Sequence, residues 1–189
     1  MSMRAGVVVI VALVASLSSA RAAPQAPPLP RKIVAGSSSV IHLTGHAGGI
    51  VQIDGPGGRR SFHSGDATDL VIVGGGTLSI GALDGTRVHL SARRIVLEGA
   101  VHADALELSA GELIDIRAAA TIDAAAVRLR ARVVINAGRV SASNAGGGAI
   151  DIVADDVANQ GALAATGARG DGGAVRVRYQ RQLMESVAN

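Results

Sequence analysis

The sequence has no cysteine and almost no aromatic residues, with one phenylalanine, one tyrosine and no tryptophan among 189 residues. Without cysteine, the chain can form no disulfide and no cysteine-ligated zinc or iron–sulfur site. Apolar residues still make up 48% of the chain, so a core must be built from Ala, Val, Ile and Leu. Small and β-branched side chains of this kind favour thin, repetitive sheets over a core arranged around large rings.

The sequence also lacks a dense basic region. Its formal net charge is +3, and Lys32 is its single lysine. Removing Arg4 and Arg21 with the leader described next would lower the net charge from +3 to +1. Because nucleic-acid binding needs a clustered basic face, we expect no nucleic-acid partner.

Residues 1–22 have the three parts of a secretory signal peptide. Arg4 supplies the positive charge, residues 5–17 form an apolar run of 13, and small residues follow. We expect cleavage after Ala22, with Ala20 as the alternative. The run is shorter than the roughly 20 residues that cross a bilayer. We therefore predict no membrane span in the mature chain and a secreted or cell-surface location.

Residues 23–39 are a proline-rich linker and lead-in, and a repeat begins beyond them. The pattern apolar-x-apolar-x-small starts at seven places, the last of which ends on a tyrosine. These starts are Ile41, Leu70, Val88, Leu106, Val127, Ile150 and Val175, at spacings of 29, 18, 18, 21, 23 and 25.

Two further short segments follow the first one in most repeats. The second segment carries the apolar pairs Ile95/Leu97, Ile114/Ile116 and Val133/Ile135. The third ends on alanine, in the segments 101–103, 122–124, 140–142 and 163–165. Apolar residues alternate with a period of two, which indicates strands and not helices. We predict a single-stranded parallel β-helix over residues 40–179, with about six short coils of three strands.

The outward positions of the predicted first strands carry a row of polar side chains. In stacking order they are His89, Glu107, Arg128, Asp151 and Arg176. The last four alternate in charge, which is typical of a solvated face that holds neighbouring strands in register. A second predicted ladder joins Asn136 and Asn159, which occupy the same place in consecutive coils and which we expect at turns.

The stretch GGGAIDIVADDVANQGALAATGARGDGGAVRV, residues 146–177, resembles the repeats of filamentous-haemagglutinin-like proteins. The likeness is most specific over residues 133–177 and looser over residues 41–131. The resemblance implies a right-handed, exported β-helix that serves as an adhesin or display stalk at the cell surface or outer membrane. It also implies a host or cell-surface receptor, or a polysaccharide, as partner.

Catalytic groups do not converge in the repeats. Asp155-Asp156 is the only adjacent carboxylate pair, and Glu112 and Asp115 fall in the equivalent turn two coils earlier, about 9.6 Å away. No histidine follows His102, and none of the five histidines has a metal-ligand spacing with a carboxylate. We therefore expect no enzyme activity, no metal and no cofactor.

Two other functions stay open as alternatives. One is a β-helix enzyme acting on polysaccharide, because many parallel β-helices are lyases or hydrolases. The other is a polymer-forming scaffold similar to the bactofilins, whose 18-residue coil matches the spacing of Leu70, Val88 and Leu106. That scaffold would self-associate end to end.

One short motif is a candidate binding site. Arg169, Gly170 and Asp171 form the tripeptide read by integrins, and they fall in the longest loop between predicted coils. The same residues are also good turn formers. Residues 180–189 are expected to be a C-terminal cap or tail, since Leu183, Met184 and Val187 have helical spacing.

Overall fold

The computed structural model describes residues 40–46, 50–56, 58–63, 69–73, 75–167 and 172–179. The signal peptide, the linker, the candidate tripeptide and the C-terminal residues 180–189 lie outside these ranges, and their predicted roles stay predictions. Within the described ranges every regular element is a β-strand. No helix there is long and apolar enough to span a bilayer.

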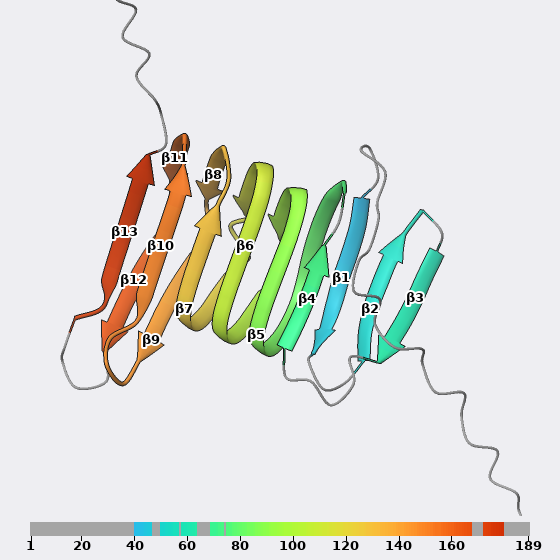
Figure 1. Ribbon diagram of the computed structural model, residues 1–189, viewed down its shortest axis with the longest axis horizontal. Coiled ribbons are helices and arrows are strands. Elements are labelled where there is room, and N and C mark those ends of the chain that lie inside the picture. Colours follow the sequence, from blue (N-terminus) through green and yellow to red (C-terminus); the bar gives the residue numbers. More distant parts are fainter. Residues whose placement is uncertain are drawn as a thin grey trace, which may run out of the picture.

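Thirteen strands make up the described part of the chain (Figure 1). In order they are β1 (Val40–His46), β2 (Ile50–Gly55), β3 (Gly58–His63), β4 (Asp69–Val73), β5 (Thr77–Leu97), β6 (Ala100–Ile116), β7 (Thr121–Arg130), β8 (Val133–Asn136), β9 (Arg139–Asn144), β10 (Ala149–Ala154), β11 (Asp156–Asn159), β12 (Ala162–Gly167) and β13 (Ala174–Tyr179). Strands β5 and β6 bend around corners and so contribute to more than one face.

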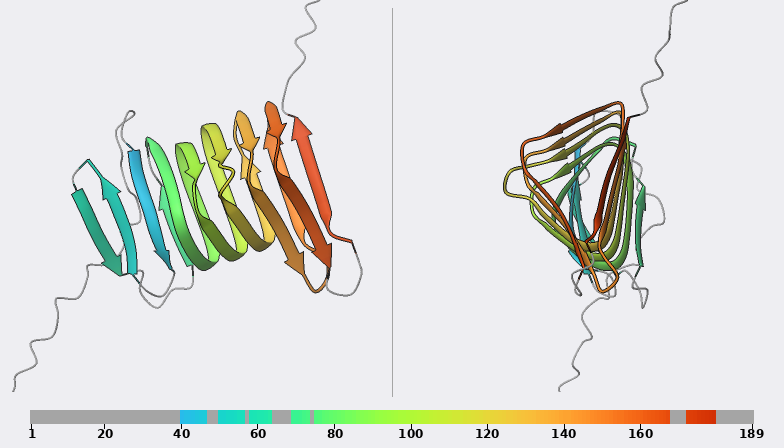
Figure 2. Two further views of the ribbon diagram at one scale, coloured as in Figure 1. Left: turned by 180° about the vertical axis from the view of Figure 1, so that it is seen from behind. Right: turned by 90° about the vertical axis from the view of Figure 1, so that its left-hand side faces the viewer.

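The strands wind into a three-sided parallel β-solenoid, as the view along its axis in Figure 2 shows. We call its first side face A. It consists of β4, residues 87–92, residues 105–110, residues 126–130, β10 and β13. In Figure 1 these strands run upward in front, and the chain returns behind them while it advances from right to left. The coil is therefore right-handed.

The register of face A confirms the predicted first strands from Leu70 onward. The aligned residues are Leu70, Val88, Leu106, Val127, Ile150 and Val175. The chain thus completes five turns. The Ile41 segment starts no turn on face A, because Ile41 pairs with Leu78 on the next face.

The other two sides follow the same rule. Face B contains residues 77–80, 94–97 and 113–116 with β8 and β11. Face C contains residues 83–85, 100–103 and 121–124 with β9 and β12. Face C confirms the third predicted strand, since Val101, Ile122, Val140 and Leu163 are aligned.

One predicted pair on face B is out of phase by one residue. The sequence predicted Val133 and Ile135 as the inward pair, but Val134 and Asn136 are the buried residues of β8. Val134 stacks on Ile114, and Asn136 stacks on Ile116. The sequence of this segment, Val-Val-Ile-Asn, allows either alternate pair of residues to point inward. The inward residues of the preceding turn therefore decide which pair does so.

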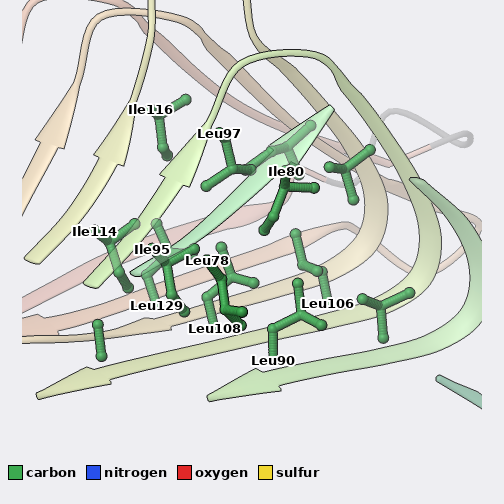
Figure 3. Packing of buried hydrophobic residues seen from close by; sticks show 14 of the residues in the cluster. Leu78, Ile80, Leu90, Ile95, Leu97, Leu106, Leu108, Ile114, Ile116 and Leu129 are labelled. Carbon is green, nitrogen blue, oxygen red and sulfur yellow. The ribbon is translucent and has the colours of Figure 1, made fainter. Parts of the chain in front are cut away.

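The core is a set of aliphatic columns that run along the solenoid axis. Inward residues of neighbouring turns pack directly on one another, as Leu90, Leu108 and Leu129 do in Figure 3. All three are fully buried. Each such side chain contributes about 1.5–3 kcal/mol when it leaves water. No single turn encloses these residues, so the stability of each turn depends on its neighbours.

An antiparallel hairpin extends the N-terminal end of the solenoid. Strand β1 pairs in parallel with β5, but β2 pairs antiparallel with β1, and β3 pairs antiparallel with β2. Val51 and Ile53 on β2 are buried, and Phe62 on β3 packs against the same core. The N-terminal end therefore differs from the parallel turns that follow it.

Backbones of successive turns touch at the corner between faces B and C. A Cβ atom at Gly161 would overlap the carbonyl oxygen of Gly138, and one at Gly138 would overlap the carbonyl oxygen of Ala120. Glycine at these corners lets the turns stack at the spacing that the strands require.

We predict that Gly161→Ala destabilises the protein by about 1–3 kcal/mol, because the added methyl forces two turns apart. Gly146→Ala is the matched control, since a Cβ there meets no atom within 4 Å. It should change stability by less than about 0.5 kcal/mol. Urea unfolding of both variants measures the difference, and equal midpoints would contradict the proposed corner contact.

Candidate binding surface

The outward positions of face A form the predicted charged row. His89 pairs with Glu107, Glu107 with Arg128, Arg128 with Asp151, and Asp151 with Arg176 across neighbouring strands. Nδ1 of His89 lies 3.3 Å from a carboxylate oxygen of Glu107, and Nε of Arg128 lies 3.9 Å from Asp151. The predicted register and the charge alternation are therefore both confirmed.

A second outward row lies beside the first one, and it was not among the rows predicted from the sequence. It contains Arg130 on β7, Val153 on β10 and Arg178 on β13, which are paired side by side. The segments Val127-Arg-Leu-Arg and Val175-Arg-Val-Arg place both of their arginines outward through the period-two alternation. The same alternation that revealed the first row could have revealed this one.

Together the two rows form an arginine cluster around a single carboxylate. Its members are Arg128, Arg130, Arg176 and Arg178, and Asp151 stands between them. Nε of Arg178 donates to Oδ1 of Asp151 at 3.2 Å, and its terminal nitrogen donates to Oδ2. The side chain of Asp151 is only 17% exposed, whereas those of Arg128 and Arg178 are 51% and 63% exposed. The C-terminal half of face A therefore has a local excess of three positive charges.

A groove of about 450 Å³ runs next to the charged row. Small side chains line it on consecutive strands, and these are Ala105, Ala126 and Ala149. The charged row borders the alanines from His89 to Asp151, and Arg87 also lines the groove. Because the aligned alanines come from β6, β7 and β10, the groove crosses the strands and follows the solenoid axis.

A second charge ladder occupies the corner between faces A and B. Glu112 lies 3.7 Å from Nε of Arg93 and 4.0 Å from Nε of Arg94. One turn further on, Arg132 lies 3.9 Å from Asp155. Two of the acidic residues that the sequence analysis considered, Glu112 and Asp155, are thus each in contact with an arginine of a neighbouring turn.

Asp115 is the remaining acidic residue that the sequence singled out. It lies on face B, where a carboxylate oxygen is 3.2 Å from Nε of Arg117. Its side chain is 16% exposed, and that of Arg117 is 60% exposed.

The predicted asparagine ladder is present, although its physical basis differs from the expectation. Asn136 and Asn159 are paired, and Nδ2 of Asn136 donates to Oδ1 of Asn159 at 2.7 Å. No residue other than glycine has a positive φ in the described ranges, so left-handed turn geometry does not explain these asparagines. Asn136 is buried in an inward column, where the hydrogen bond from its side-chain amide to Asn159 links two turns.

The histidines do not gather at one place. His89 lies on face A and His102 on face C, whereas His42 pairs with Ser79 on face B. Near His102 a polar hollow of about 360 Å³ contains Asp104 and Asp123. The described residues contain no group of three or more side chains placed to hold a metal ion.

Comparison with known proteins gives no relative for this chain: no family model, no curated protein and no solved structure matches it. The candidate tripeptide Arg169, Gly170 and Asp171 lies outside the described residues, between β12 and β13. Its role as a binding site stays a prediction.

We predict that Asp151→Asn destabilises the protein by roughly 1 kcal/mol at low salt, because Arg128 and Arg178 lose their carboxylate partner and four arginines then lie together without a negative charge between them. The loss should shrink in 1 M salt, where charge repulsion is screened within about 3 Å. Asp155→Asn is the control, since Asp155 is more exposed and lies at 3.9 Å from Arg132. Denaturant unfolding at two salt concentrations compares the variants, and a salt-independent loss for Asp151→Asn would argue against this electrostatic role.

Proposed function

We propose that this chain is an exported, non-catalytic β-helix rod with a structural or adhesive role at the cell surface. The observation that carries the proposal is that outward charged residues form ion pairs between neighbouring turns. Arg128–Asp151, Arg132–Asp155 and the contacts of Glu112 all join residues of neighbouring turns. Such contacts stabilise a stack of turns, which is what a rod requires.

The leader supports export, and the surface of face A supports the adhesive role. Its arginine cluster and its alanine-lined groove lie on the same side of the solenoid. Exposed surfaces of this kind, carried on a rigid scaffold, suit contact with an extended partner.

The strand edges favour a separate rod over a polymer-forming scaffold. At the N-terminal end the outermost described strand is β3, which runs antiparallel to β2 and exposes Arg60, while its Arg59 is paired with Asp54. At the C-terminal end β13 exposes Arg176, while its Arg178 is paired with Asp151. Like charges on Arg60 and Arg176 disfavour end-to-end pairing of these two edge strands.

The export part of the proposal is tested by fractionation and intact-mass measurement of the full chain. We expect the protein outside the cytoplasm, with a mature chain that begins at Ala23. Val9→Arg is the control, because a charge in the apolar run should block export and leave the leader attached. An uncleaved, cytoplasmic wild-type chain would contradict the proposal.

A further inference from the structure

We propose that face A binds a linear polysaccharide that carries carboxylates, with Arg130 and Arg176 as its main contacts. This inference names a partner for the adhesive role and rests on that proposed function. It concerns the arginine cluster and the groove beside it, neither of which depends on the candidate tripeptide.

The charge distribution within the cluster leaves two guanidinium groups available. Asp151 engages Arg128 and Arg178. Within the described ranges no ion pair or side-chain hydrogen bond is found for Arg130 or Arg176. Both arginines point outward, since their strand neighbours Leu129 and Val177 occupy the inward phase. Arginine guanidinium groups on an exposed face favour an anionic partner.

The cluster itself shows how a carboxylate is held on this surface. Arg178 contacts both oxygens of Asp151 through two nitrogens of one guanidinium group. This two-point arrangement is specific for planar carboxylates and stronger than a single contact. Arg130 and Arg176 present the same fork to solvent, and we infer that ligand carboxylates occupy it in the same manner.

The spacing of the arginines favours a linear ligand that lies along the rod. Arg128 and Arg176 are two strands apart in one row, and Arg130 and Arg178 are two strands apart in the other. Two strand spacings amount to about 9.6 Å. Strands β7, β10 and β13 lie next to one another in Figure 1, so both rows follow the axis. A polymer with repeated anionic groups can therefore meet successive arginines.

The groove continues the line of the arginine rows along the solenoid axis toward the N-terminal end. Its alanines lie one residue from the inward column and two residues from the charged row, on the strands that carry Arg128 and Asp151. An uncharged part of a sugar chain fits against these small side chains. Face A has no described aromatic side chain before Tyr179 on its last strand. Charge, and not ring stacking, therefore provides most of the binding free energy.

The test is direct binding of the purified mature protein to polygalacturonate, with the fully methyl-esterified polymer as the uncharged comparison. We expect binding only to the free carboxylate form, with an affinity that falls as salt is raised. Arg130→Gln with Arg176→Gln should raise the dissociation constant by at least about tenfold. The matched control is Arg60→Gln with Arg139→Gln, which removes the same charge from other faces and should change affinity less than about twofold.

Three results would overturn the inference. They are equal binding of the esterified polymer, equal weakening by the control variant, and binding to dextran sulfate at least as tight with the same arginine dependence. Circular dichroism of each variant confirms that the solenoid is folded. Because binding is measured on purified protein, a failure here is distinct from a failure of export, which fractionation reports separately.

Discussion

The in-register stacking of inward aliphatic residues is the constraint on which the rest of this structure depends. A turn of 18–25 residues, such as those that begin at Leu70 and Ile150, cannot enclose its own apolar side chains. Only the next turn covers them, and it does so when its inward side chains are in register with theirs, as Leu108 is with Leu90. The aliphatic composition of the chain fits this requirement, because side chains of similar size pack on one another along the columns.

The outward surface follows from that stacking. Once the inward residues are in register, the alternate residues are in register too, and their charges must be compatible across a strand spacing of about 4.8 Å. The contacts between Arg128 and Asp151 and between Arg132 and Asp155 meet this condition. The arginine cluster departs from it, since four arginines surround one carboxylate that contacts only Arg128 and Arg178. We propose that this local excess of positive charge binds an anionic partner.

Much of the fold could be predicted from the sequence, because period-two alternation and the recurring alanines mark faces A and C directly. The phase of β8 could not, since its four residues permit two phases and contact with Ile114 and Ile116 decides between them. Local pattern also could not assign the Ile41 segment to a face. The hairpin of β2 and β3 had a usable signal in the glycine–proline turn at residues 55–58. The second row of arginines had a usable signal as well, since Arg130 and Arg178 follow Arg128 and Arg176 by two residues and therefore share their outward phase.

A disulfide across two turns tests the stacking most directly, and the absence of native cysteines makes the experiment clean. Ser91 and Ser109 are paired on face A, and Arg130 is the next residue in the same row. Ser91→Cys with Ser109→Cys places two Cα atoms about 4.8 Å apart, within the range of a disulfide. This pair should lose both free thiols on air oxidation, as alkylation and intact mass would show. Ser91→Cys with Arg130→Cys, two strands apart, should keep them. A reduced first pair or a cross-linked second pair would contradict the register described here.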